Sequence, residues 1–229
     1  MAQAAAVGTV SEARVNSFIA QVFLVMSIGL LITALVATTV TTRIEFLIRM
    51  ATSPWIPFGL FIIQIIVVVA ISGAVMRMSA GLALLLFIFY SALTGVTIST
   101  IFLVYTQEQI ATVFWITAGT FLLTSIIGLV LKRDLSSSGS LLMMLLIGWV
   151  IAWTISIIFF PSGTFNWMLN FIGIALFVGL TAYSTNMLKQ MGQQLDAHPA
   201  RGGLIVLGAL NLYLNFINLF LLLLRVSSR

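Results

Sequence analysis

The most regular feature of the sequence is an alternation between long apolar runs and short polar breaks. A helix that crosses a bilayer needs about 20 mostly apolar residues, because the hydrocarbon core is about 30 Å thick and each helical residue adds about 1.5 Å. Seven runs reach this length, and they cover residues 18–40, 55–76, 80–105, 109–131, 140–160, 166–188 and 203–224. The pattern therefore predicts seven transmembrane helices.

The polar breaks between these runs are all short. The clearest is KRDLSSSGS at residues 132–140, and the longest covers residues 189–203. Neither is large enough to fold as a soluble domain with its own core. We therefore predict an N-terminal tail over residues 1–17 and one seven-helix transmembrane domain over residues 18–229.

Composition agrees with this interpretation. The chain is 61% hydrophobic and only 7% charged, whereas an average soluble domain is about 25% charged. The predicted fold class is therefore all-α, a polytopic membrane protein. The net charge of +5 comes from basic residues that stand singly or in pairs between apolar runs. This distribution fits anchoring to lipid headgroups rather than nucleic-acid binding.

The basic residues also predict an orientation, because short cytoplasmic loops are enriched in Lys and Arg. With the N-terminus inside, six basic residues lie on the inner side and four on the outer side. The inner six are Arg14, Arg77, Lys132, Arg133, Lys189 and Arg201, and the outer four are Arg43, Arg49, Arg225 and Arg229. If the last run re-enters instead of crossing, the bias becomes eight against two. We expect a cytoplasmic N-terminus in either case.

The residue inventory excludes most enzyme chemistry. The sequence has one histidine, His198, no cysteine, no HExxH zinc motif and no GxxxxGK[ST] phosphate loop. All five carboxylates map to a tail, a loop or a helix end, and they are Glu12, Glu45, Glu108, Asp134 and Asp196. Proton relays inside membranes usually need Asp or Glu at depth. We therefore expect no catalytic residue, no cofactor and no metal site, and we interpret His198 as a loop residue.

Three clusters of neutral polar residues remain inside the predicted spans. The last span carries Asn211, Asn215 and Asn218, the sixth carries Tyr183, Ser184 and Asn186 among others, and the third carries Ser91 and Thr94. At about 100° per residue the three asparagines share one helical face. An unpaired amide costs several kcal/mol in lipid, so this face must contact protein or water. Two interpretations stay open: hydrogen bonds that hold helices together, or a polar cavity or ion path between helices.

Arg77 follows the second apolar run. One interpretation is a topology anchor whose side chain reaches the headgroups, and the other is a charged latch at the cytoplasmic mouth of a path. Gln64 lies deep in the same run and is interpreted as a packing contact rather than a ligand.

Several segments together resemble the Bax-inhibitor family of membrane proteins (transmembrane Bax-inhibitor-motif proteins), particularly its bacterial members. The resemblance covers nearly the whole chain. It is carried by AQVFLVMSIGLLITALVA at 20–37, MSAG at 78–81, YSALTGVTISTIFLVYT at 90–106, KRDLSSSGS at 132–140, FVGLTAYSTNMLK at 177–189 and GALNLYLNFINLFLLLLR at 208–225. It implies seven helices with a central, semi-polar last helix, a cytoplasmic N-terminus and a calcium-permeable leak.

One departure from the family pattern matters for function. Family members typically read AYDT in the sixth helix and LYLDFINLF in the last, and the resemblance implies that these two aspartates close the pore and sense pH. Two close carboxylates can share a proton. Here the matching positions are Ser184 and Asn215, and neither can ionise. We therefore expect this chain to share the architecture of the family and to lack its pair of acids as a pH sensor.

The resemblance implies a calcium-leak protein of a bacterial inner membrane, with a weak response to pH. Its partners are then the lipid bilayer and calcium ions. The alternative is a non-conducting regulator that binds another membrane protein, such as a protease or a stress or death-pathway partner. Liposomes that contain a calcium dye distinguish the two hypotheses.

Overall fold

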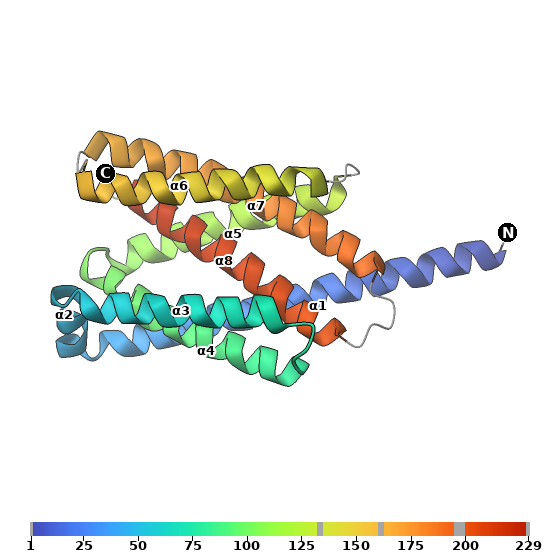
Figure 1. Ribbon diagram of the computed structural model, residues 1–229, viewed down its shortest axis with the longest axis horizontal. Helices are drawn as coiled ribbons and strands as arrows, with labels where there is room; N and C mark the ends of the chain where they lie inside the picture. Colours follow the sequence, from blue (N-terminus) through green and yellow to red (C-terminus); the bar gives the residue numbers. More distant parts are fainter. Residues whose placement is uncertain (1, 132–134, 160–162, 195–199, 228–229) are drawn as a thin grey trace. The chain divides into compact units, whose positions relative to one another are not determined.

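The computed structural model describes residues 2–131, 135–159, 163–194 and 200–227, and this part of the chain is almost entirely helical (Figure 1). His198 and Asp134 lie outside the described residues. The elements are α1 (Ala2–Thr41), α2 (Ile44–Thr52), α3 (Trp55–Ala74), α4 (Ala80–Ile98), the 3₁₀ helix η1 (Ser99–Leu103), α5 (Gln107–Val130), the 3₁₀ helix η2 (Ser136–Ser138), α6 (Gly139–Phe159), α7 (Gly163–Gln194) and α8 (Arg201–Ser227).

Seven of these helices are long and apolar enough to cross a membrane, which confirms the predicted fold class. The seven segments are Glu12–Thr41, Trp55–Ala74, Ala80–Leu103, Gln107–Val130, Gly139–Ser156, Thr164–Gln193 and Arg201–Ser227. The last of them is one unbroken helix of 27 residues, or about 40 Å. A helix of this length favours crossing over re-entry.

Three features differ from the expected boundaries. Residues 2–17, expected as a tail, begin the same helix as the first span. Helix α7 continues to Gln194, through the start of the expected polar linker. The break after the first span contains a nine-residue helix, α2, whose Leu47 and Met50 are buried. These two apolar residues are three positions apart, which places them on one face of a short amphipathic helix.

Local sequence explains several helix ends. The side chain of Ser79 caps α4 by accepting a hydrogen bond from the Leu82 backbone N–H at 3.3 Å. Thr106 and Gln109 form a reciprocal capping box at the start of α5, at 3.0 and 3.2 Å. Such boxes satisfy two of the backbone N–H groups that the first turn of a helix leaves unpaired.

The chain divides into two compact units. Unit 1 comprises Met1–Tyr105 and Gly192–Tyr213, and unit 2 comprises Thr106–Met191 and Leu214–Arg229. Helix α8 therefore contributes its first half to unit 1 and its second half to unit 2.

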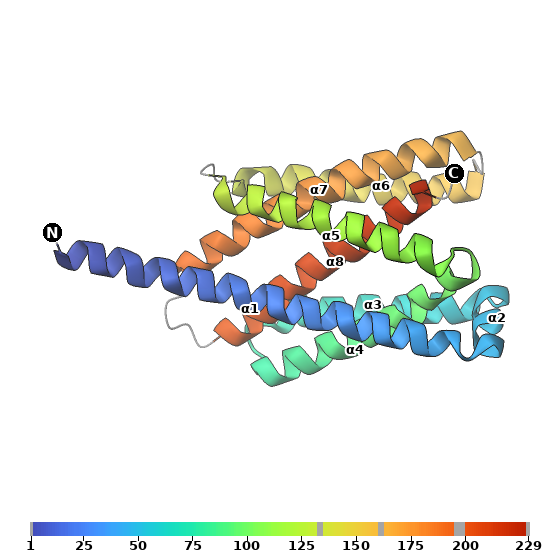
Figure 2. The ribbon, with the colours of Figure 1, turned by 180° about the vertical axis from the view of Figure 1, so that it is seen from behind.

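In unit 1, helix α4 packs against both α1 and α3. Gly95 makes the approach of α4 to α1 possible, because a Cβ there would lie 2.7 Å from the backbone oxygen of Thr33. Small residues allow this kind of close helix approach in membranes. Gln64 of α3 donates a hydrogen bond to Thr97 of α4 at 3.0 Å, so Gln64 joins these two helices. Figure 2 shows α1 from the other side, with α2 at the end of α1 that is away from the N-terminus.

In unit 2, α6 and α7 run alongside each other (Figures 1 and 2). Trp149 of α6 contacts the Phe177 ring edge-on at 5.8 Å and donates its indole N–H to the Leu169 carbonyl at 2.8 Å. The second half of α8 adds Leu219 and Leu222 to a buried apolar cluster with Leu176, Phe177 and Leu180 of α7. Unit 2 thus has its own apolar core.

Candidate functional site

The three asparagines of α8 differ in their surroundings. Asn215 is only 7% exposed, Asn218 is half-buried and Asn211 is exposed. Asn218 donates to the Leu214 carbonyl of its own helix at 2.8 Å. The expectation that this face contacts protein holds for Asn215, and for Asn211 the contact with protein or water stays a prediction. Four residues turn a helix by about 400°, so Asn211 is offset by about 40° and one whole turn from Asn215.

Asn215 makes a polar contact between helices. Its Nδ2 donates a hydrogen bond to the Oγ of Ser184 on α7 at 3.1 Å. Ser184 is half-buried. Asn215 lies 14 residues after the start of α8, or about 21 Å along the helix, so the contact is near the middle of this span. Two neutral groups therefore face each other at membrane depth.

The hydroxyls next to this contact are already used within α7. Thr181 donates to the Phe177 carbonyl at 2.7 Å, and Thr185 donates to the Thr181 carbonyl at 2.6 Å. Within the described residues, no group of three His, Cys, Asp or Glu side chains could hold a metal ion. The oxygens at the Ser184–Asn215 contact are thus those of one hydroxyl and one amide.

Asn186, two residues after Ser184 on α7, has a different role. Its Nδ2 donates to the carbonyls of Gly128 at 3.1 Å and Leu131 at 3.5 Å. Its Oδ1 accepts from the Leu135 N–H at 3.2 Å and from Gln190 at 3.0 Å. Helix α5 ends at Val130, so Asn186 satisfies carbonyls that a helix end leaves unpaired.

Lys189 completes the same arrangement, and the sequence analysis counted it only among the inner basic residues. Its Nζ donates to the Leu129 carbonyl at 2.8 Å. A cation at the C-terminal end of a helix is favourable, because that end carries partial negative charge. We refer to Asn186 and Lys189 as the α5 clasp. Its position indicates a structural role in holding α5 to α7.

Tyr183 packs against the first residue of α6. A Cβ on Gly139 would collide with the Tyr183 hydroxyl, so glycine leaves room for the ring at this point. Tyr183 is half-buried and points to α6 rather than joining the Ser184–Asn215 contact. The structure therefore separates the sixth-span residues into three contacts with three different neighbours.

A second polar network lies in unit 1 and centres on Thr33. The Thr33 Oγ1 lies 2.9 Å from the carbonyls of both Gly29 and Ser91 and 2.5 Å from the Tyr213 hydroxyl. Thr33 has one hydroxyl proton, so when it donates to a carbonyl, Tyr213 is the donor to Thr33. Tyr213 and Ser91 are each 0% exposed. We refer to Thr33, Ser91 and Tyr213 as the tyrosine network.

Ser91 and Thr94 also bond to their own helix. Their hydroxyls donate to the Phe87 and Tyr90 carbonyls, each at 2.9 Å. Sequence analysis singled out both residues but not Thr33. A threonine in an apolar run gives no sequence signal of its partner on another helix.

Comparison with known proteins identifies the family. The family model described as "Inhibitor of apoptosis-promoting Bax1" matches residues 15–228. The chain belongs to the Bax inhibitor-1 family.

Relatives within the Bax inhibitor-1 family cover almost the full chain. The "Inner membrane protein YbhL" of Escherichia coli K12 is 43% identical over 217 residues, which is 94% of this chain and 92% of the relative. A protein of Borreliella burgdorferi is 42% identical and covers 92% of this chain and 90% of its own length. A membrane protein of Streptococcus pyogenes is 34% identical and covers 96% of each. Seven candidate spans and an inner-membrane relative agree on a multi-pass membrane protein.

In terms of the Bax inhibitor-1 resemblance, the two positions expected to carry aspartates are those of Ser184 and Asn215. The hydrogen bond between them means that acids at both positions would face each other across α7 and α8. The exposed Arg77 lies in the turn between α3 and α4, and its side chain has no hydrogen-bond or ion-pair partner among the described residues. Both interpretations of Arg77, anchor and latch, remain predictions.

Proposed function

We propose that this Bax inhibitor-1 protein is a cation leak, with calcium as the first ion to test, and that its conduction is nearly independent of pH between about pH 6 and 8. The observation that carries the proposal is the 3.1 Å hydrogen bond between Asn215 and Ser184. It joins two groups that cannot ionise, at the positions where the family resemblance implies an acid pair.

Neutral oxygen ligands favour the passage of a calcium ion over its tight binding. Calcium sites of high affinity use six to eight oxygens, several of them from carboxylates. An amide and a hydroxyl supply too little charge to hold the ion. A leak requires that an ion leave as readily as it enters, and this contact meets that requirement.

The contact is also weak enough to open. Hydrogen bonds between membrane helices contribute about 0.6 kcal/mol on average, which is close to the thermal energy. Breaking this bond frees one amide and one hydroxyl to meet water or an ion. Protonation has no part in the step, because neither group titrates in this range.

The test is calcium entry into liposomes that contain purified protein and an internal calcium dye, measured from pH 6 to 8. Four proteins are compared: the unchanged chain, Ser184→Asp, Asn215→Asp and the double variant. We expect flux above empty liposomes and a flat pH profile for the unchanged chain. The double variant should gain a steep profile, with flux rising as pH rises, because two close carboxylates repel once both are charged.

Each single acid should change the profile less, because the repulsion needs two charges. Asn211→Asp is the matched control, since it adds one acid to the same helix at an exposed position. A steep profile in the unchanged chain would contradict the proposed pH independence. No flux from correctly folded protein would overturn the leak and leave the alternative, a regulator that binds another membrane protein.

A further inference from the structure

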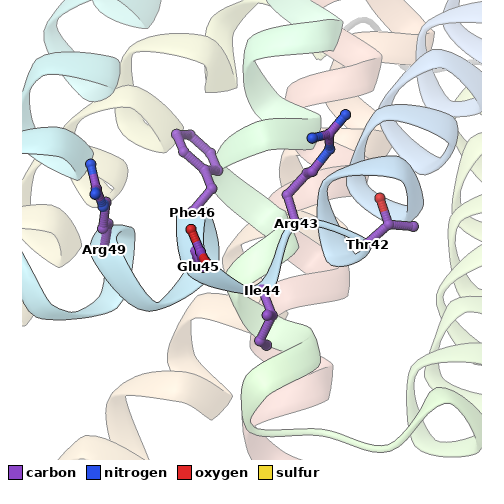
Figure 3. Close-up of a pocket in the computed structure, with 6 residues that line it drawn as sticks. All are labelled: Thr42, Arg43, Ile44, Glu45, Phe46 and Arg49. Carbon is purple, nitrogen blue, oxygen red and sulfur yellow. The ribbon is translucent and has the colours of Figure 1, made fainter.

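A pocket in unit 1 lies away from the polar contacts of the spans. It has a volume of about 720 Å³ and is lined by Thr42, Arg43, Ile44, Glu45, Phe46 and Arg49 (Figure 3). These residues come from the turn after α1 and from the first two turns of α2. Figure 3 shows Arg43 and Arg49 on either side of the Phe46 ring, with Glu45 between them. The pocket therefore brings two cations of one short segment to a single hollow.

Both guanidinium groups of the pocket are available to a ligand. Arg43 and Arg49 are exposed, and neither has a side-chain hydrogen bond or ion pair within the described part of the chain. Glu45 is likewise exposed and unpaired there. The charges of the lining sum to +1. Arginine is suited to phosphate, because its planar fork donates two parallel hydrogen bonds to two oxygens.

The location of the pocket indicates a lipid rather than a dissolved anion. The candidate span of α1 ends at Thr41, and the next begins at Trp55. The pocket thus lies at the end of two spans, at the level where lipid phosphates are found. Ile44 in the lining is 55% exposed, and Trp55 at the start of the next span is 78% exposed, so each span end presents apolar surface. Trp is typical of this boundary between headgroups and acyl chains.

The fold of α2 fixes the arginines in place. Leu47 and Met50 are 1% and 2% exposed and anchor α2 in unit 1. The backbone N–H groups of Phe46 and Leu47 both bond to the Arg43 carbonyl, at 2.9 and 3.2 Å. Arg43 at the N-cap of α2 and Arg49 within α2 are therefore carried by an ordered backbone, which lowers the entropy cost of binding a headgroup.

We propose that this pocket binds the headgroup of an anionic phospholipid, with Arg43 and Arg49 on the phosphate and Ile44 and Phe46 against the start of the acyl chains. The net charge of +1 favours a lipid of charge −1, such as phosphatidylglycerol, over a zwitterionic lipid. Glu45 lowers the affinity, because its carboxylate lies beside the phosphate position.

The test is native mass spectrometry of the full chain, delipidated in a neutral detergent. The protein is offered an equimolar mixture of phosphatidylglycerol, phosphatidylethanolamine and phosphatidylcholine with identical acyl chains. We expect preferential retention of phosphatidylglycerol. Arg43→Ala and Arg49→Ala should each reduce its retention roughly five-fold, on the basis of the usual contribution of one basic residue near an anionic lipid.

Two further variants distinguish binding in this pocket from general attraction of anionic lipid to positive charge on the protein. Arg77→Ala removes the same charge from an exposed turn of unit 1 outside the pocket and should reduce retention of phosphatidylglycerol far less than either pocket variant. Glu45→Gln should strengthen retention of phosphatidylglycerol. An equal loss in Arg77→Ala, or no preference among the three lipids, would overturn the proposal.

Two other outcomes would assign the pocket to a different ligand. Displacement of the lipid by millimolar inorganic phosphate would indicate a site for a free anion and overturn the lipid assignment. Preference for phosphatidylethanolamine, weakened by Glu45→Gln, would mean that Glu45 binds the lipid ammonium group and would overturn the anionic assignment. All of the substituted side chains are exposed, so folding of the variants is expected to be retained.

Discussion

Helix α8 makes two polar contacts only two residues apart, and they differ in how tightly protein surrounds them. Tyr213 belongs to the tyrosine network of unit 1, whereas Asn215 bonds to Ser184 in unit 2. Each contact therefore lies within one unit.

The tyrosine network is enclosed by rings and by close helix packing. Phe87 and Tyr90 contact the Tyr213 ring edge-on at 5.5 and 5.9 Å. A Cβ on Gly29 would lie 2.5 Å from the Phe87 ring. The Ser184–Asn215 contact, in contrast, consists of one hydrogen bond to a half-buried serine. An enclosed network with several partners indicates stability, and a single part-buried hydrogen bond indicates a contact that can open. The following predictions test that difference.

The largest expected effect is on the close approach of α1 and α4 in unit 1. Gly95→Ala places a methyl group 2.7 Å from the Thr33 oxygen and 2.8 Å from the Val36 Cβ. The backbone oxygen cannot rotate away, so the helices must separate. We expect a loss of about 3 kcal/mol in the free energy of unfolding, the upper end for overpacking. This loss in the free energy of unfolding is measured by equilibrium unfolding in mixed detergent micelles.

Gly73→Ala is the matched control for Gly95→Ala. Gly73 lies on α3 of the same unit, and a Cβ there would have nothing within 4 Å. Alanine is the better helix former, so this variant should be as stable as the unchanged chain or slightly more stable. Equal destabilisation by the two substitutions would show that the close approach at Gly95 does not limit the packing of unit 1.

In unit 2 the corresponding polar anchor is the α5 clasp rather than the Ser184–Asn215 contact. Asn186→Ala removes the donor to the Gly128 carbonyl and the acceptor of the Leu135 N–H. Buried polar groups left without partners cost about 1–3 kcal/mol, and we expect about 2 kcal/mol. Asn211→Ala removes an exposed amide and serves as the control in the same unfolding assay. An Asn186→Ala variant as stable as Asn211→Ala would contradict the structural role of the clasp.

The sequence predicts some of this arrangement and not the rest, for physical reasons. Apolar length alone identifies the seven spans, because the bilayer sets a minimum length for each. Helix α2 was missed because nine residues are too few for a span, and only Leu47 and Met50 carry its buried face. The contacts of Thr33 and Lys189 were missed because their partners depend on how two helices pack. Periodicity within one helix holds no information about that packing.

The asparagines of α8 illustrate the same limit. Spacing correctly places them near one face, but spacing does not determine which part of that face is covered. Asn215 is buried, and Asn211 is exposed. The importance of Ser184 and Asn215 came from the family resemblance, and the structure then brought the two side chains within hydrogen-bond distance. Stripe periodicity alone would have ranked all three asparagines equally.

A smaller effect is expected from loss of the tyrosine hydroxyl. Tyr213→Phe keeps the ring contacts with Phe87 and Tyr90 and removes the hydroxyl that bonds to Thr33. Thr33 still donates to a carbonyl, so no donor is left unpaired, and we expect a loss of about 1 kcal/mol. Tyr105→Phe is the control, because the Tyr105 hydroxyl has no partner among the described residues. Equal stability of the two variants would show that the network contributes ring packing alone.

The smallest expected effect concerns the Ser184–Asn215 contact, and it tests the comparison most directly. A double-mutant cycle with Ser184→Ala, Asn215→Ala and the combined variant isolates the interaction between the two side chains. We expect a coupling energy of about 0.6 kcal/mol, typical of a single hydrogen bond between membrane helices. The same four proteins, measured for calcium flux, should show faster leak in the variants, because the contact that joins α7 to α8 is absent. We therefore expect a small change in the free energy of unfolding and a clear change in calcium flux. A coupling energy above about 2 kcal/mol, with unchanged flux, would make this contact a stability element like the tyrosine network. The two contacts of α8 would then differ in burial and not in role.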